Sequence, residues 1–216
     1  IIHFQYPHQT LIKCINSIIK KTSYQNYEII LINNNGIKNR TNKTLIKRLK
    51  KDSRMLYHEN DTPLNDSQVK NFAVNQLAHG KQIILLNNDT KIITEDWIES
   101  LLQFSQRQNT GAVGSILFPP YKKKEYTKAF LKSQSIKSRN VTSSFNEDNW
   151  PHAIQNVQML SKACLMVKKT IYLQIGGFDE REVVENDVDF CLRLIEKGYL
   201  NVYTPFAKVY HTNISI

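Results

Sequence analysis

The sequence predicts an α/β fold in which a doubly wound, mostly parallel sheet is flanked by helices. Short apolar runs of strand length recur along the chain, for example at 28–32 and 83–86. Segments whose apolar residues repeat at helical spacing separate these runs. The two runs end abruptly in polar residues, at 33–36 and 87–89. Because open α/β sheets bind ligands at such strand ends, we expect a site along this edge of the sheet.

Length and composition are those of one compact domain. The chain has 216 residues, of which 41% are hydrophobic and 22% charged, so a sizeable core is possible and extensive disorder is excluded. No stretch approaches the roughly 20 apolar residues of a membrane span. Residues 1–4 have the pattern of a buried strand without a basic leader, so we expect no signal peptide and a piece of a longer chain. Three separated cysteines predict buried thiols and a reducing, cytoplasmic compartment.

The net charge of +10 is unevenly distributed. Residues 38–54 carry eight Lys or Arg against one acid, and residues 122–139 carry seven against one. Such basic segments can bind nucleic acid or an anionic membrane surface. Between residues 140 and 196 the acids outnumber the bases, and we expect the chemistry to lie in that segment.

The expected elements of the first half alternate between strand and helix. Strands are expected at 1–4, 28–32, 55–57, 83–86 and 112–118, and helices at 11–19, 41–51, 65–78 and after Thr94. Thr10 and Thr94 are the expected N-caps of their helices. Glu95 and Asp96 suit the positive end of the helix dipole in the first turn that follows Thr94.

The alternation stops at residue 119. Residues 119–150 begin with two prolines, contain three consecutive lysines and lose periodicity, so we expect a long, mobile and functional insertion over the sheet. Strands are then expected at 156–160, 164–167, 200–203 and 209–210, with a glycine turn at 176–177 and a helix at 187–196. The predicted apolar stripe of that helix is Val188, Cys191, Leu192 and Ile195. No linker divides the chain, so residues 1–216 are expected to form a single domain.

Several motifs with a defined chemistry are missing. The sequence has no Walker A loop and no Gly-x-Gly-x-x-Gly, His-Glu-x-x-His or Gly-x-Ser-x-Gly motif. This argues against a P-loop ATPase, a Rossmann dehydrogenase, a zincin and an α/β-hydrolase. The polar residues at strand ends remain as candidates.

The first candidate is the Asn-Asn-Asp turn at 87–89, which directly follows a buried run. A carboxylate at the carboxyl edge of a sheet suits a hard cation such as Mg²⁺ or Mn²⁺, whose usual co-ligands are nucleotide phosphates. The alternative is an Asx-turn that merely ends the strand. His211, at the end of a later strand, is a structural residue unless the fold brings it beside Asp89.

The second candidate is the acidic segment 179–189, which follows the glycine pair. Asp187 and Asp189 lie in the first turn of the expected helix, where an acid can be a catalytic base or simply a cap. The density of acids in this segment exceeds what capping requires.

In this order, the motifs resemble those of inverting nucleotide-sugar glycosyltransferases of family 2, which have the GT-A fold. The matching segments are 28–34, 85–90, 163–167, 176–180, 186–193 and 203–211. They are similar to bacterial rhamnosyltransferase-like, O-antigen and capsule enzymes, and the resemblance covers essentially the whole chain except 119–150. It implies a nucleotide-binding half at about 1–118 and an acceptor and catalytic half at about 151–216.

The resemblance also implies roles for single residues. Asp187 matches the catalytic base, and Asp89 with His211 matches the site of a divalent cation, Mn²⁺ or Mg²⁺. The implied donor-binding residues are Asn33, Asn71, Asn87, Asn88 and Asp89, and the implied acceptor-side residues are Asp179, Glu180 and Asn186. Asn33, Asn87 and Asn186 stand where the family usually has acids, and the usual Pro after the first strand is missing.

The implied reaction moves a sugar from a UDP- or dTDP-linked donor to a glycan or lipid-linked acceptor in bacterial surface polysaccharide synthesis. A cation neutralises the leaving group, and one carboxylate takes the acceptor proton, which implies inversion. The basic segments would contact the inner face of the cell membrane. The alternative is a catalytically degenerate homologue that binds sugars or scaffolds a synthase. Nucleic acid is not an expected partner, because the basic helix 41–51 lacks interleaved aromatics.

Overall fold

A computed structural model describes residues 1–5, 9–34, 47, 52–60, 62, 64–118, 152–181 and 186–212. The expected insertion at 119–150 and, apart from Lys47, the expected basic helix at 41–51 lie outside these residues. The statements below concern the described part of the chain.

The N-terminal part forms a parallel three-stranded sheet. Its strands β1 (Ile2–Phe4), β2 (Ile29–Asn33) and β3 (Met55–Glu59) lie in that order. Strand β4 (Gln82–Leu86) continues this surface through Ile1, whose amino group donates to Ile84 O at 2.7 Å and whose carbonyl accepts from Leu86 N at 3.1 Å. The carboxyl ends of β2 and β4 therefore meet at one edge, as the sequence predicts for its candidate site.

The second sheet is mixed. Its order is β4-β8-β6-β9-β5, and β7 pairs with β9. The strands are β5 (Thr90–Ile92), β6 (Thr110–Phe118), β7 (Gln155–Val157), β8 (Cys164–Lys168) and β9 (Leu200–His211). Strands β6 and β9 are parallel, whereas the other pairs of this sheet are antiparallel. The α/β class is confirmed, with parallel pairing concentrated in β1–β3 and in β6–β9.

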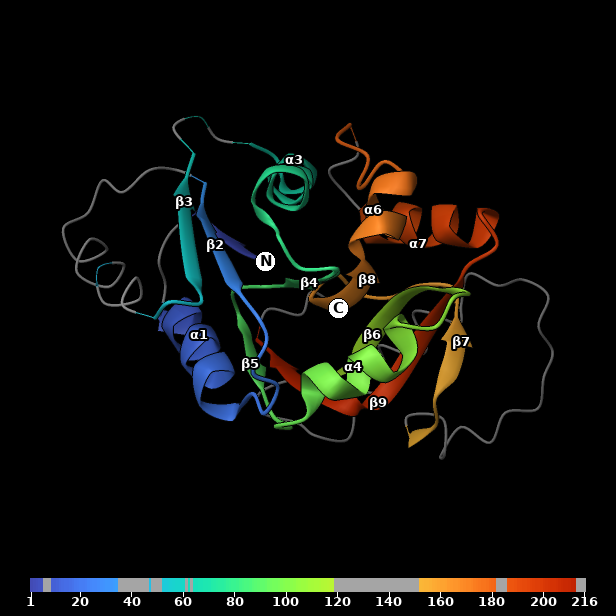
Figure 1. Cartoon of the computed structure of the whole chain (residues 1–216), viewed down its shortest axis with the longest axis horizontal. Helices are drawn as coiled ribbons and strands as arrows, with labels where there is room; N and C mark the ends of the chain where they lie inside the picture. Colours follow the sequence, from blue (N-terminus) through green and yellow to red (C-terminus); the bar gives the residue numbers. More distant parts are fainter. Residues whose placement is uncertain are drawn as a thin grey trace.

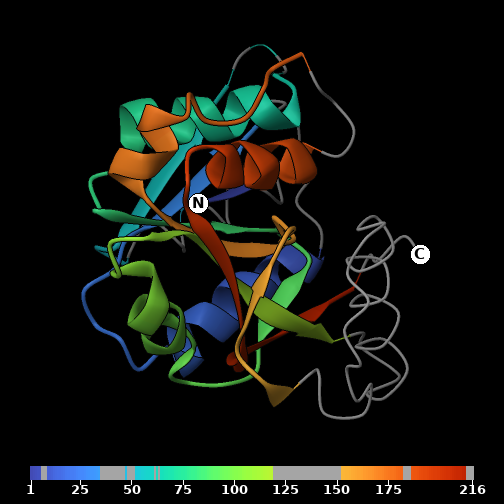
Figure 2. The same ribbon diagram turned by 90° about the vertical axis from the view of Figure 1, so that its right-hand side faces the viewer.

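Helices cover both faces of the sheets (Figures 1 and 2). On one face lie α1 (Gln9–Lys21) and α4 (Trp97–Ser105), and on the other α3 (Asp66–Phe72), α6 (Lys169–Gln174) and α7 (Asn186–Glu196). Each face has its own core, one around Ile15 and Leu101 and the other around Val69 and Phe190. Truncation of a buried aromatic such as Phe190 to Ala would cost about 3–5 kcal/mol.

Helix α3 begins where the sequence places it. The Asn65 side chain accepts from Gln68 N, and the Gln68 side chain accepts from Asn65 N, so two otherwise unpaired helix N–H groups are satisfied. The helix continues as a π-helical turn over Ala73–Leu77. The expected helix at 65–78 is therefore confirmed, with a change of winding near its end.

Three expected boundaries are wrong. The expected strands at 200–203 and 209–210 are one strand, β9, with a register shift opposite Ser115 and Ile116. Thr94 does not cap a helix: its hydroxyl donates to Phe206 O and accepts from Lys208 N, and α4 begins at Trp97. Thr10 lies inside α1, which starts at Gln9. Strand β5 and helix α6 were not expected, since both are short.

The buried face of α7 also differs from the predicted stripe. Leu192 and Ile195 are 44% and 40% exposed, whereas Phe190 and Leu194 are fully buried. The four predicted apolar positions span more than one side of the helix, and packing against β6 and β9 selects Phe190, Cys191 and Leu194 instead.

The expected buried thiols are confirmed. Cys14, Cys164 and Cys191 are free and buried, and burial raises the pKa of Cys14 to about 11 and the pKa values of Cys164 and Cys191 to about 12. These thiols are therefore protonated at neutral pH. Among the helices of the described part, none combines the length and apolar character needed to cross a membrane.

Candidate active site

Strand pairing brings His211 beside Asp89. Strands β5 and β9 are antiparallel with Thr90 opposite His211, so the residue before β5 lies next to the end of β9. His211 Nε2 lies 3.2 Å from Asp89 Oδ1, and the two residues are 9% and 8% exposed. Thr212 donates from both its N–H and its hydroxyl to the Asp89 carbonyl, which holds the end of β9 in place. The condition that the sequence sets for a role of His211 is met.

Asn87 completes this group. Its Nδ2 lies 3.3 Å from His211 Nε2, so when Asn87 donates, the histidine proton is on Nδ1. The Asn87 carbonyl accepts from Thr90 N and from Thr90 Oγ1, so 87–90 is also a tight turn. The turn and the polar cluster are thus one structure, and Asn88 is half-buried within it.

The geometry of Asp89 and His211 fits one hard divalent cation. Octahedral Mg²⁺ binds ligands at about 2.1 Å, which places neighbouring ligand atoms about 3 Å apart. The observed 3.2 Å between Asp89 Oδ1 and His211 Nε2 agrees with that spacing. Among the described residues no group of three His, Cys, Asp or Glu side chains could hold a metal. The remaining ligands would therefore be an Asn87 oxygen, donor phosphates and water.

Asn33 lies at the carboxyl end of β2 and is 1% exposed. Its Nδ2 donates to the Tyr57 hydroxyl at 3.2 Å, and that hydroxyl donates to Glu59 Oε2 at 3.1 Å. Burial and the nearby Glu59 carboxylate raise the pKa of Tyr57 to about 12. The ends of β2 and β3 therefore present a polar chain on the same edge as the turn 87–89, where a nucleobase would be recognised.

Asn71 has an unexpected set of partners. Its Nδ2 donates to Phe178 O and Glu180 Oε1, and its Oδ1 accepts from Phe178 N and from the Tyr172 hydroxyl. Asn71 therefore holds the loop that contains the expected acceptor-side residues. A role in binding the donor stays a prediction.

The expected acceptor-side acids differ in environment. Asp179 pairs with the exposed Arg181, whose hydrogen bonds lower the pKa of Asp179 to about 2. Glu180 lines an open pocket of about 570 Å³ together with Asn71, Phe178, Asp189 and Arg193. This pocket is a place for an acceptor beside the loop 176–181.

The two acids in the first turn of α7 have different partners. The Asp189 carboxylate binds Arg193, which also donates to the carbonyls of Ile175 and Gly177. Asp187 Oδ2 accepts the backbone N–H of Lys162 at 3.3 Å. Asp189 thus takes part in anchoring the glycine turn, which favours Asp187 as the base among these two.

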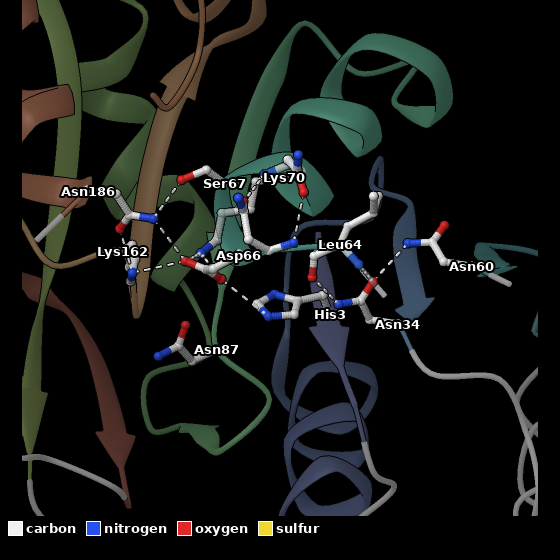
Figure 3. Close-up of polar contacts among 12 residues, drawn as sticks. His3, Asn34, Asn60, Leu64, Asp66, Ser67, Lys70, Asn87, Lys162 and Asn186 are labelled. Atoms are coloured by element: carbon white, nitrogen blue, oxygen red, sulfur yellow. Dashed lines mark hydrogen bonds and ion pairs between the residues drawn. The ribbon is translucent and has the colours of Figure 1, made fainter. Parts of the chain in front are cut away.

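A cluster around Asp66 was not anticipated from the sequence (Figure 3). The Asp66 carboxylate binds Lys70 Nζ at 2.6 Å, Lys162 Nζ at 2.9 Å and Asn186 Nδ2 at 3.1 Å, and its Oδ1 lies 3.2 Å from His3 Nε2. Asn186 is fully buried, also donates to Ser67 Oγ, and orients the start of α7. Its contact with an acceptor stays a prediction. No local pattern links residues so far apart in the chain, so sequence reasoning had no signal for this cluster.

The cluster strongly perturbs its ionisable groups. Burial acts to raise the pKa of the Asp66 carboxyl, but the surrounding basic groups outweigh burial and hold that pKa well below its usual range. Burial lowers the pKa of Lys70 to about 8, and burial together with the Lys70 charge lowers the pKa of His3 to about 4. At neutral pH, Asp66 is therefore ionised and His3 is neutral.

Comparison with known proteins identifies the family. The model described as Glycosyl transferase family 2 matches residues 1–175. The chain is 26% identical to the O-antigen biosynthesis protein RfbC of Myxococcus xanthus, over 98% of this chain and 17% of that protein. A stretch of 71 residues is 38% identical to N-acetylglucosaminyl-diphospho-decaprenol L-rhamnosyltransferase of Mycobacterium tuberculosis, covering 32% of this chain and 23% of the relative. The chain thus spans about a fifth of the length of these relatives.

Solved structures confirm the GT-A fold. The chain superposes on GalNAc-T7 with UDP, GalNAc and Mn²⁺ with a TM-score of 0.76 at 13% identity, over 98% of this chain and 43% of that chain. It superposes on the mannosyltransferase PcManGT from Pyrobaculum calidifontis in complex with GDP-Man and Mn²⁺ with a TM-score of 0.74 at 12% identity, over 98% of this chain and 55% of that chain. Because the family model covers most of the sequence and the folds agree, the chain belongs to glycosyl transferase family 2.

Proposed function

We propose that this chain is the catalytic domain of an inverting glycosyltransferase that moves a sugar from a nucleoside diphosphate sugar to an acceptor hydroxyl. The observation that carries the proposal is the Asp89–His211 pair beside Asn87 at the carboxyl edge of the sheet. Membership of family 2 supports the reaction class. The rhamnosyltransferase name and the UDP and GDP-Man in the titles of the two structures support the donor class.

In this proposal the protein itself supplies binding, orientation and a base. Asn33 and the turn 87–89 hold the nucleotide and its phosphates, and the loop at 176–181 faces the acceptor. Asp187 takes the proton of the acceptor hydroxyl as that oxygen attacks the anomeric carbon from the side opposite the leaving group. One base with direct displacement inverts the anomeric centre, and no second nucleophilic carboxylate is required.

Asp89 and His211 would hold a divalent cation, Mn²⁺ or Mg²⁺. When bound, such a cation neutralises the charge that develops on the departing diphosphate. Asn87 contributes no charge, so one carboxylate and one imidazole would supply the protein share of the site. We therefore expect the cation to bind tightly only together with the donor diphosphate.

The proposed setting is surface polysaccharide synthesis at the cytoplasmic face of the bacterial membrane. The names of the O-antigen protein and of the decaprenol-linked transferase support a glycan or lipid-linked acceptor and a UDP- or dTDP-sugar donor. Both basic segments of the sequence would favour peripheral contact with anionic lipids.

The test begins with purified protein and a panel of nucleotide sugars in a thermal-shift assay, with and without Mn²⁺. A bound donor raises the melting temperature by mass action. The best donor is then assayed for metal-dependent release of its nucleoside diphosphate. Stabilisation without any turnover would favour the degenerate, sugar-binding homologue, to which Asn87 and Asn186 point.

A further inference from the structure

Lys162 links the cluster around Asp66 to the proposed base. Its Nζ donates to Asp66 Oδ2 at 2.9 Å and also to Asn186 Oδ1, while its backbone N–H donates to Asp187 Oδ2 at 3.3 Å. One residue therefore contacts both of the first two residues of α7. It does so from the turn before β8, which is hydrogen-bonded to the other half of the site through Asn87 N and Ala163 O at 3.1 Å.

These contacts connect the donor half to the catalytic half of the domain. Asp66 belongs to α3, His3 to β1 and Asn186 to α7, and Figure 3 shows Asn87 beside the Asp66–Lys162 pair. The first N–H groups of a helix have no partner within the helix, so the start of α7 depends on such outside contacts for its position. Asn186, the first residue of α7, is 0% exposed and binds Lys162, Asp66 and Ser67.

The charges of the cluster balance only when Asp187 is included. Lys70 and Lys162 are two cations, Asp66 is one anion, and the negative charge of Asp187 also acts on Lys70. The neutral side chain of Asn186 suits this arrangement, because it donates to Asp66 and accepts from Lys162. A carboxylate in its place could not donate and would lie about 3.1 Å from the Asp66 oxygen.

We propose that Lys162 is a positioning residue, which holds the Asp187 carboxylate in the orientation needed to accept the acceptor proton. The inference rests on the proposed function, in which Asp187 is the base. It also assigns a reason to Asn186: an amide at this position ties α7 to Asp66 and Lys162. Lys162 itself does not contact substrate in this proposal.

The experiment compares Lys162→Met and Lys162→Arg with Lys168→Met as the matched control. Lys168 also precedes a helix, and its Nζ donates to Arg107 O at the surface, away from Asp187. The assay is hydrolysis of the nucleotide sugar that most stabilises the wild type, and donor binding is measured with UDP or dTDP plus Mn²⁺. We expect Lys162→Met to lower kcat about 10–100-fold with Kd within about threefold, as for misplacement of a catalytic group. Lys162→Arg should recover most of kcat, and Lys168→Met should match the wild type.

A double-mutant cycle separates positioning from a general structural effect. In an Asp187→Asn background, Lys162→Met should cause little further loss of kcat, because the group it positions is already inactive. Asn186→Asp, which keeps the shape but removes both N–H donors, should give the same kcat-selective loss and replaces Lys162→Met if that variant does not fold. Equal losses in both backgrounds, a normal kcat in Lys162→Met, or a parallel loss of donor affinity would each overturn the inference.

The same data distinguish this inference from the proposed function. If Asp187→Asn abolishes turnover while Lys162→Met and Asn186→Asp remain fully active, only the positioning role fails. If the wild type turns over no donor, the proposed function fails and the positioning role fails with it.

Discussion

Asp89 and His211 lie far apart in the sequence, yet their side chains approach to 3.2 Å where β5 begins and β9 ends. Both are nearly buried, and Asn87 lies against the same imidazole nitrogen. A carboxylate and an imidazole at this spacing can share one divalent cation, which makes the pair the first target for mutation.

Asp89→Ala should abolish metal-dependent nucleotide binding. The variant removes the only charged oxygen ligand of the proposed site and leaves the neutral Asn87 and His211, so we expect the affinity for UDP or dTDP in the presence of Mn²⁺ to fall more than about tenfold. Isothermal titration with and without Mn²⁺ measures the change. Glu95→Gln, which removes an exposed carboxylate before α4, should titrate like the wild type. An unchanged Mn²⁺ dependence in Asp89→Ala would show that this pair is not the metal site.

Asp187→Asn should lower turnover by about a hundredfold or more while donor binding survives, because it keeps the shape and removes the proton acceptor. Asp189→Asn is the matched comparison, since it lies on the same turn but pairs with Arg193. We expect Asp189→Asn to reduce stability, through a looser glycine turn, more than it reduces kcat of the folded protein. The opposite pattern, an active Asp187→Asn and an inactive Asp189→Asn, would transfer the role to Asp189.

His3 should make folding sensitive to mild acid. Its pKa is about 4 in the folded protein against about 6.5 when unfolded, so the unfolded state binds more protons between these values and stability falls as the pH drops from about 6.5 to 4. The loss is at most about 3 kcal/mol, and the 23% exposure of the side chain makes it smaller. Urea unfolding of His3→Gln across this range should give a flatter curve.

The control for His3 is His152→Gln, since His152 is exposed. Its stability curve should keep the steepness of the wild type between pH 4 and 6.5. Equal steepness in His3→Gln and wild type would mean that another group causes the acid sensitivity.

Gly177→Ala should disrupt the loop that Asn71 holds. Gly177 has φ +68°, and a Cβ there would collide with Asn71 Oδ1 and Tyr172. We expect a loss of about 2–3 kcal/mol from strain and a broken hydrogen bond. Gly176→Ala is the matched control, because φ is +80° but a Cβ there has no neighbour within 4 Å, so only about 1 kcal/mol of backbone strain is expected. Thermal unfolding of both variants checks the difference, and equal losses would exclude a special role for the Asn71 contact.

Much of the fold follows from local sequence pattern. The apolar runs at 28–32 and 83–86 form buried strands, and Asn65 with Gln68 starts a helix as a capping box, because these features depend on neighbouring residues alone. The polar turn at 87–89 likewise marks the edge of the sheet where the site lies. Where the local signal was weak or shared between structures, as at Thr94 and at the start of β9, the expected boundary was wrong.

The family resemblance added what no single motif could. It placed His211 with Asp89, and the antiparallel pairing of β5 with β9 brings them together. The cation, the base and the donor remain predictions, because they concern ligands that bind to the fold rather than the fold itself.

The sequence by itself determined the order of strands and helices, the edge that carries the site and the polar residues along that edge. Only the tertiary structure decided which of those residues share partners: Asp189 with Arg193, Asn71 with the glycine loop, and Asp66 with Lys70 and Lys162. Periodicity describes which face of an element is apolar, but a polar contact between distant segments depends on strand register and on side-chain direction. Both are set by the packing of the whole core, so they could be read only once the chain was folded.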